Sequence, residues 1–387
     1  MNAKQWCFNA LDTWFFRESR SHSVVGSSEL ASLFPPPART VAGAVRTLIG
    51  DNAGVNWKTY PKQAVVKNGV NLFEQIGDAD DFGQLRLTGP YLIYQEQRLY
   101  PAPLSILEKD DKFKYLQIGG PVHCDLGEKV QLPILTEPGA KPLENAWLTE
   151  PGLQRVLAGK LPTPAMVIRQ SDLFENEPRL GIAIDDSKRS TKKGLLYQTQ
   201  HIRPFENVKV GVIVQGIDPK LQPTTTRQVR FGGEGRVAAV TVTKAPLPTF
   251  KIPTGGQQLL LMLLTSADLG CDKQSWLPSA DFEQTEDKNG NTIWQGRLNG
   301  VELTIISAVL GKAVREGGWD LQRECPRPVK SLVPAGSVWF CQVKDNIKSA
   351  VEQLHGFQIG EETALGRGEL VAGVWSGQQK DIAHPTQ

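Results

Sequence analysis

The segment from Leu11 to Gly50 reads as the end of a strand, a polar loop with two arginines, three consecutive prolines and a short helix. After the prolines, apolar residues recur at positions i, i+3, i+4, i+7 and i+8, which predicts one core-facing side of a helix. These residues are Val41, Ala44, Val45, Leu48 and Ile49. The segment therefore predicts a strand followed by a helix that buries one side.

The opposite side of this helix carries Arg39, Gly43 and Arg46. A glycine between two arginines lets another chain approach closely, with guanidinium forks in place for phosphate groups. Periodicity alone favours a solvated amphipathic helix with no ligand. We interpret the three residues as a candidate RNA-binding surface because of the segments described below.

Length and charge limit the class of protein. A chain of 387 residues is too long for one ordinary core and predicts two domains. Many glycines and prolines favour turns and long connections over a helical bundle. The 43 basic and 41 acidic residues nearly balance, so a nucleic-acid surface has to be a local concentration of charge.

The cysteines indicate neither a disulfide framework nor a zinc site, because the five are scattered and none forms a CxxC pair. No sequence motif calls for a cofactor. The N-terminus has no signal pattern, and no apolar run approaches the length that spans a bilayer. We expect a cytoplasmic protein that does not bind membranes.

The first predicted domain covers residues 1–204. It contains a strand at 5–11, the arginine-faced helix, strands from 84 onward and a helix from Thr149 to Ala158 with Thr149 as its N-cap. Two further strands, 181–185 and 195–202, form a predicted hairpin. Its connection is basic, with Lys188, Arg189, Lys192 and Lys193. Such a tip either aids solubility or grips a nucleic-acid backbone through charge.

The second predicted domain covers residues 205–387. It begins with an alternating strand at 208–216 and continues with a hairpin whose turn holds three glycines, a buried strand and a helix from Asp345 to His355. The order strand, helix, strand with antiparallel hairpins is typical of a split βαβ, ferredoxin-like domain. The first half of the chain permits the same interpretation.

Catalytic motifs are missing from the sequence: we find no P-loop, HExxH, GxSxG or dinucleotide fingerprint. The run Gly232-Gly233-Glu234-Gly235 lies between two predicted strands, so it predicts a hairpin turn rather than a phosphate loop at a helix start. Contact of its backbone with RNA is a second possibility. The paired acids Asp185-Asp186 and Glu361-Glu362 are predicted to be solvated.

Six segments resemble one family in the same order along the chain. They are FFRESRSH, LFPPPARTVAGAVRTLIG, RLGIAIDDSKRSTKKGLLYQTQHIRPF, FGGEGR, PRPVKSLVPAGSVWF and ALGRGELVAGVW. Together they extend from residue 8 to residue 375. The chain resembles the third-subunit family of the Cmr effector complex, which belongs to the RAMP (repeat-associated mysterious protein) superfamily of type III-B CRISPR systems.

The resemblance implies an α+β fold of two tandem ferredoxin-like (RRM-like, split βαβ) domains with long loop and hairpin insertions. It also implies a non-catalytic subunit that holds the 5′ tag of the CRISPR RNA. Its protein partners would be the large polymerase/cyclase subunit and the adjacent backbone subunit. Three groups of RNA-binding residues follow: Arg17, Arg20, His22, Arg39, Gly43 and Arg46; then Lys188, Arg189, Lys192 and Lys193; then Gly232, Gly233, Arg236 and Arg367.

Two other functions remain open at this point. Repeat-processing relatives often use a histidine, so His22 makes a metal-independent endoribonuclease the alternative. Backbone subunits cut target RNA with an aspartate in the corresponding loop, but no aspartate occurs between Asp12 and Asp51. A scaffold that binds only protein is the third hypothesis.

The tail ALGRGELVAGVW equally permits a glycine-rich loop against RNA or a strand that closes the second domain.

Overall fold

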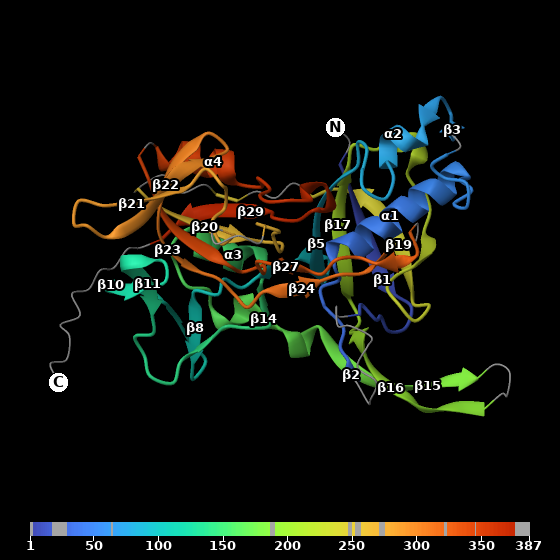
Figure 1. Cartoon of the computed structure of the whole chain (residues 1–387), viewed down its shortest axis with the longest axis horizontal. Coiled ribbons are helices and arrows are strands. Elements are labelled where there is room, and N and C mark those ends of the chain that lie inside the picture. Colours follow the sequence, from blue (N-terminus) through green and yellow to red (C-terminus); the bar gives the residue numbers. More distant parts are fainter. Residues whose placement is uncertain are drawn as a thin grey trace.

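The computed structural model describes residues 3–17, 29–62, 65–185, 190–246, 250–251, 257–270, 275–320, 323–344 and 346–375, without the side chains of residues 29 and 182–197. The fold is mixed α+β, with many strands and few helices. Two lobes lie side by side, each built on one curved sheet (Figure 1). A long hairpin projects from the first lobe (Figure 1).

The sheet of the first lobe has six strands in the order β18-β19-β1-β17-β5-β6. Their bounds are β1 Lys4–Ala10, β5 Arg86–Tyr94, β6 Gln97–Arg98, β17 Val208–Gln215, β18 Arg227–Arg230 and β19 Val237–Lys244. All neighbouring pairs are antiparallel. Strand β1 therefore lies in the interior of the sheet, between β17 and β19.

Helix α1 (Ala38–Ala53) covers one face of this sheet, as the sequence predicted. Val41, Val45 and Ile49 are fully buried against Trp6 and other residues of one core. The helix ends at Gly54, whose φ of 79° is the left-handed conformation that glycine adopts without strain. The predicted apolar stripe is thus confirmed as the inner side of α1.

The sheet of the second lobe has eight strands, seven of them in the order β10-β11-β22-β23-β28-β20-β29, with β21 added beside β22. Their bounds are β10 Gln117–Cys124, β11 Gly127–Ile134, β20 Gln258–Leu263, β21 Glu283–Glu286, β22 Thr292–Leu298, β23 Val301–Val309, β28 Val338–Val343 and β29 Leu370–Val374. Both faces are covered, since α4 (Ile347–Leu354) packs in one core and α3 (Glu150–Leu157) in the other.

Both predicted helices of this lobe are confirmed. Thr149 caps α3, with its side chain accepting a hydrogen bond from the backbone N–H of Gly152. Asn346 caps α4 in the same way, because its side chain accepts a hydrogen bond from the backbone N–H of Lys348. Such caps satisfy backbone donors that have no partner inside the helix.

Short elements occupy the rest of the described chain. Helix α2 (Leu72–Ile76) follows α1, and three-residue helical turns are η1 Pro164–Met166, η2 Gln170–Asp172, η3 Pro219–Leu221 and η4 Thr363–Leu365. The smaller sheets contain β2 Glu29–Leu30, β3 Val66–Lys67, β4 Val70–Asn71, β7 Tyr100–Pro101, β8 Ile106–Lys109, β9 Lys112–Tyr115, β12 Lys141–Pro142, β13 Ala146–Leu148 and β14 Val167–Arg169. In the part of the chain that the structure describes, no helix is long and apolar enough to cross a membrane.

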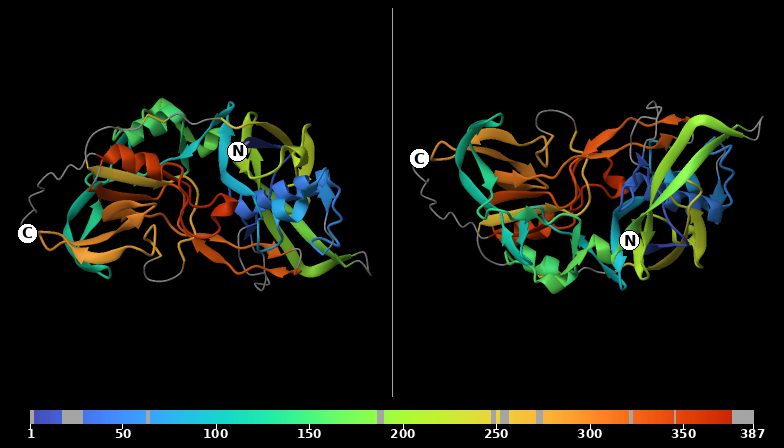
Figure 2. Two further views of the ribbon diagram at one scale, coloured as in Figure 1. Left: turned by 90° about the horizontal axis from the view of Figure 1, so that it is seen from above. Right: turned by 90° about the horizontal axis from the view of Figure 1, so that it is seen from below.

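The projecting hairpin consists of β15 (Phe174–Asp185) and β16 (Ser190–Pro204). It is longer than the predicted strands at 181–185 and 195–202. The views from above and below also show it extending beyond the body of the first lobe (Figure 2). A hairpin at this place was predicted from the two strand patterns and the basic connection between them.

The division between the lobes corrects the predicted boundary at residues 204 and 205. Strands β17 and β19, expected to open a second domain, pair with β1 on its two sides. Strands β10 and β11, from the first half of the chain, join the sheet of the second lobe. The chain thus crosses between lobes several times, because sheet partners are chosen by long-range pairing rather than by order in the sequence.

Residues 359–370, here called the wedge, enter both cores. Leu365 is fully buried in the core of the first lobe, whereas Ile359 and Leu370 belong to that of the second. Gly366 has a φ of 95°, and a Cβ at this position would overlap the carbonyl oxygen of Gly89 in β5. Only glycine therefore allows the wedge to approach β5 this closely.

Gly366→Ala is expected to lower the free energy of unfolding by about 2 kcal/mol or more, because it adds both left-handed strain and a backbone clash. Thermal unfolding of the full chain measures the change. Gly43→Ala is the matched control: nothing lies within 4 Å of a Cβ there, and the exposed position is helical. That control should stabilise the protein by about 0.5–1 kcal/mol; equal effects of the two variants would contradict the proposed close approach.

Candidate nucleic-acid interface

The predicted site residues fall into three sets in the structure. Four of them, Arg20, His22, Lys188 and Arg189, lie outside the described residues. Lys192 and Lys193 lie in β16, but their side chains are not described. The remaining eight are Arg17, Arg39, Gly43, Arg46, Gly232, Gly233, Arg236 and Arg367, and they do not form one surface.

The two arginines of α1 are engaged with protein. Arg39 forms an ion pair with Glu362 of the wedge. The guanidinium carbons of Arg39 and Arg46 lie 5.8 and 5.4 Å from the ring centroid of Phe82, a cation–π geometry. Burial lowers the pKa of Arg46, whose guanidinium stays charged at neutral pH. The prediction of two free phosphate-binding forks is therefore wrong, and only Gly43 remains exposed on this face.

Arg367 is an interior residue, which contradicts its assignment to an RNA contact. Its side chain is 3% exposed and donates two hydrogen bonds to Glu316, at 3.1 and 2.6 Å. Glu362 approaches the same guanidinium, with 3.2 Å between Nε and Oε2, and lies 3.4 Å from Nζ of Lys330. The expectation of a solvated Glu362 is wrong as well, since this carboxylate joins three basic groups.

The glycine-rich turn between β18 and β19 is confirmed as a hairpin turn. The N–H of Phe231 donates to the carbonyl of Arg236, and the N–H of Gly233 donates to the carbonyl of Phe15 at 2.7 Å. A Cβ on Gly232 would overlap that same Phe15 carbonyl. One side of this turn therefore packs against the segment that follows β1, and the Gly233 N–H is not free for RNA, although both glycines are exposed.

A cluster of charges joins the base of the hairpin to Asp12, the second residue after β1. The carboxylate of Asp12 accepts from Arg179 at 3.1 Å, Arg203 at 3.2 Å and Arg236 at 2.9 Å. Glu177 pairs with Arg179 and Arg203 at 2.7 and 2.5 Å. Three guanidinium groups surround two carboxylates, so one positive charge is in excess at a partly exposed site.

Electrostatics within this cluster favour the charged forms. Burial raises the pKa of Asp12, but hydrogen bonds and charge from Arg179 and Arg203 outweigh it and bring the pKa below its usual value. The same balance lowers the pKa of Glu177. Among these residues the sequence identified Arg236 alone. The others come from distant segments, and no spacing in the sequence links them.

His201 lies beside the cluster and is closed to substrate. Its side chain is 1% exposed, its ring stacks on Phe15 with 5.2 Å between centroids, and Nδ1 lies 3.0 Å from the hydroxyl of Thr13. Burial, followed by the charge of Arg236, lowers its pKa to about 4. The imidazole is therefore neutral and covered at pH 7. The described residues contain no group of three or more metal-binding side chains.

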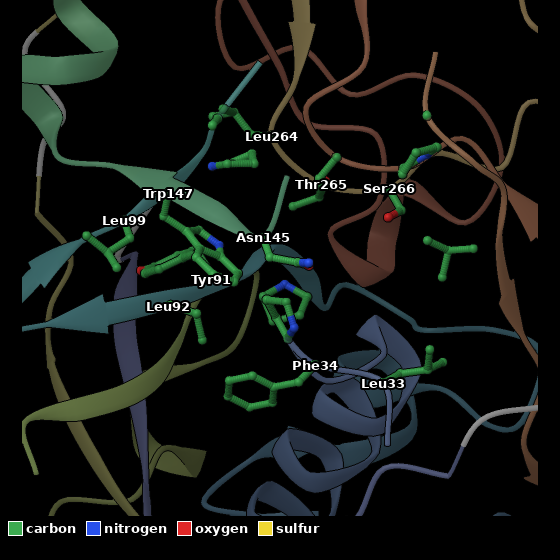
Figure 3. A pocket seen from close by; sticks show the side chains of 18 of the residues that line it. Leu33, Phe34, Tyr91, Leu92, Leu99, Asn145, Trp147, Leu264, Thr265 and Ser266 are labelled. Carbon is green, nitrogen blue, oxygen red and sulfur yellow. The ribbon is translucent and has the colours of Figure 1, made fainter. Parts of the chain in front are cut away.

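A cavity of about 470 Å³ lies between the lobes. Its walls combine the segment 33–38, which contains the three prolines, with residues 264–266 and 334–335 of the second lobe. The side chains of Phe34, Asn145 and Trp147 surround the hollow in Figure 3. The lining is mostly apolar, and its charged members include the paired Arg367 and Glu316 together with Arg98, Glu144 and Lys312.

Comparisons with known proteins identify one family. The model of the family described as CRISPR-associated protein (Cas_Cmr3) matches residues 6–375. No curated protein matches the chain.

Solved structures that resemble the chain come from CRISPR complexes. A chain of the type III-B Cmr-beta complex bound to cognate target RNA and AMPPnP is 14% identical over 90% of this chain and 87% of that chain, with a TM-score of 0.46. A chain of the Csm3-Csm4 subcomplex in the type III-A CRISPR-Cas interference complex is 12% identical over 89% of this chain and 94% of that chain, with a TM-score of 0.38.

Arg367→Met is expected to lower the free energy of unfolding by about 3–5 kcal/mol at pH 8, because it leaves a buried carboxylate unpaired. Burial already raises the pKa of Glu316, and removing Arg367 raises it further. A folded-state pKa above the unfolded value means that the folded protein binds the extra proton, so the variant should regain stability as the pH falls. Denaturant unfolding between pH 8 and pH 5 tests this.

The matched control is the double variant Arg367→Met with Glu316→Met. Replacement of both partners by apolar groups should recover most of the lost stability and remove the pH dependence. A deficit in Arg367→Met that stays constant with pH, or that the double variant does not relieve, would show that Glu316 is not the group left unpaired.

Proposed function

The chain belongs to the Cas_Cmr3 family of CRISPR-associated proteins, and on this premise we propose that it is a non-catalytic RNA-binding subunit of a type III-B CRISPR ribonucleoprotein. In this role, as the third subunit of a Cmr complex, it holds the 5′ tag of the CRISPR RNA. It also docks the large polymerase/cyclase subunit to the adjacent backbone subunit. The family match over residues 6–375 is the observation that carries the proposal.

The proposal includes a tandem ferredoxin-like architecture within the RAMP superfamily. A split βαβ unit has the sheet order 4-1-3-2, and the order β19-β1-β17-β5 of the first lobe agrees with it. In the second lobe β29-β20-β28-β23 agrees in the same way. In the first lobe α1 occupies the place of the helix that follows the first strand of such a unit, and in the second lobe α4 occupies the place of the helix that precedes the last strand.

The RNA-binding surface that we propose is the hairpin β15–β16 with the loop that follows β1. Arg17, Arg20 and His22 follow β1 in the sequence, and Lys188 and Arg189 belong to the sequence that connects β15 with β16. Lys192 and Lys193 lie near the start of β16. The charge cluster around Asp12 fixes the base of the hairpin against the end of β1. A single strand held there would be gripped through its phosphates, with its bases free to be read by polar groups.

Basic residues that are already paired within the protein are left out of this surface. Arg39, Arg46 and Arg367 are engaged in contacts within the chain, as is Arg236 through Asp12. Gly43 is exposed with open space above it, so a chain can still pass over α1 at this point. The proposal therefore places RNA on the projecting parts of the first lobe rather than on the arginine face of α1.

Lys192→Ala with Lys193→Ala should weaken RNA binding and reduce the slope of log affinity against log salt by about 1.4, since each phosphate contact to a single strand contributes about 0.7. Filter binding of CRISPR RNA to the assembled complex over a salt series measures the slope. Lys112→Ala with Lys141→Ala removes two exposed lysines of the second lobe and is the matched control. An unchanged slope for the hairpin variant would remove the tip from the site.

The absence of catalysis is a separate prediction. Purified chain incubated with repeat RNA should give no discrete products, and His22→Ala should leave the RNA unchanged in the same way. Cleavage at defined positions that disappears in His22→Ala, without added metal, would establish the endoribonuclease alternative instead.

A further inference from the structure

The chain carries a second projecting structure that the proposed site does not use. It is a two-stranded ribbon built from β24 (Val314–Glu316), β25 (Trp319–Asp320), β26 (Cys325–Pro326) and β27 (Lys330–Leu332), here called the ribbon. It leaves the second lobe between β23 and β28 and reaches toward the first lobe (Figures 1 and 2). Sequence reasoning did not mark it as a site.

The ribbon and the hairpin β15–β16 leave equivalent places in the two sheets. The hairpin is part of the insertion between β5 and β17, which are neighbours in the first sheet. The ribbon is inserted between β23 and β28, which are neighbours in the second. When the strands of each split βαβ unit are numbered along the chain, β5 and β23 are the second strands and β17 and β28 are the third. Both insertions therefore lie between the second and third strands of their units. The ribbon is thus the topological counterpart of the hairpin in the other lobe.

Ion pairs hold the ribbon in place. Asp320 is 2% exposed and pairs with Arg327 at 2.7 Å and with Arg323 at 3.4 Å. Arg323 also pairs with Asp80, in the loop that carries Phe82 beside α1. At the other end, Lys330 pairs with Asp268 at 2.6 Å. The ribbon is therefore a fixed feature whose position over the first lobe is set by contacts at both ends.

Trp319 projects from this fixed ribbon into solvent, with 57% of its surface exposed. Gly318 before it has nothing within 4 Å of a Cβ position, which leaves room for a flat ring to approach. Arg315 and Lys312 are exposed and have no ion pair among the described residues. An exposed indole with unpaired cations four and seven residues before it in the chain matches a single-stranded nucleic acid, which offers base rings for stacking and phosphates for the cations.

We infer that the ribbon is a second RNA contact, in which the indole of Trp319 stacks on one nucleobase and Arg315 and Lys312 face the neighbouring phosphates. Residues 312–331 hold five basic and three acidic side chains. Three of the basic ones, Arg323, Arg327 and Lys330, are engaged in ion pairs, as are the acids Glu316 and Asp320. Lys312 and Arg315 remain against one exposed acid, Glu324, so the unpaired charge is positive and favours a polyanion such as RNA. Stacking accepts any base, so the contact is tolerant of sequence.

The inference rests on the proposed function, because it adds a contact to the same RNA. Trp319→Ala should weaken retention of CRISPR RNA by the assembled complex about 5- to 100-fold, the range for loss of one base–aromatic stack. Trp319→Phe should recover part of the loss because it keeps an aromatic face. Ultraviolet crosslinking of the wild-type complex followed by peptide mass spectrometry should give a nucleotide adduct on Trp319.

Val329→Ala is the matched control on the same ribbon, since Val329 is 55% exposed but has no aromatic face. It should bind RNA as the wild type does. An RNA with a single abasic position at the stacked nucleotide should bind the wild type as weakly as intact RNA binds Trp319→Ala. Combining the two changes should then add little, because both remove the same contact.

Several outcomes would overturn the inference. Retention by Trp319→Ala within twofold of the wild type excludes stacking, and equal losses in Trp319→Ala and Val329→Ala indicate an apolar protein contact instead. If the salt slope responds to the hairpin lysines while Trp319→Ala is neutral, the ribbon contact fails and the proposed function stands. If the complex gives no RNA adduct anywhere on this chain, the proposed function fails, and the ribbon contact fails with it.

Discussion

Buried arginine–carboxylate pairs hold the wedge between the two lobes. Arg367 meets Glu316 of β24, and Arg98 of β6 meets Glu369, with side chains that are all less than 15% exposed. The guanidinium of Arg98 also lies 4.2 Å from the ring centroid of Tyr91. A charge removed from water is tolerated only when its partner is in place, so these pairs form only in one relative position of the lobes. The other contacts between the lobes depend on that position.

This constraint decides which basic residues are free for a ligand. Arg39 and Arg367 are used to bind Glu362 and Glu316, and Arg236 is used to bind Asp12. Among the described residues, Arg315 of β24 and Lys312 just before it are exposed and have no ion pair. Because the net charge is only +2, a polyanion is attracted by such local groups and not by the protein as a whole.

The two lobes share more than their sheet order. In each lobe a two-stranded projection leaves the sheet between the second and third strands of the 4-1-3-2 order. Arginine–carboxylate pairs fix both projections, at Asp12 for the hairpin and at Asp320 for the ribbon. Arginine is suited to this task because its planar fork binds two acceptors at once. The same plan is thus repeated in both lobes, and in the proposed role the hairpin and the ribbon would contact one extended RNA strand.

The sequence by itself determined the local elements: the inner side of α1, the cap of α3, the helix α4, the hairpin turn at Gly232 and the basic hairpin. Their signals lie within a few residues, because helical and strand periodicity are local properties. Tertiary structure alone decided which strands share a sheet, so that β17 and β19 joined β1. It also decided which charged side chains pair with one another. Arg39 and Glu362 are 323 residues apart, and nothing near either residue in the sequence indicates the other. Such pairs form only when the fold brings distant segments together. For this reason, arginines that the sequence indicated as ligand-binding groups have structural roles in the folded protein.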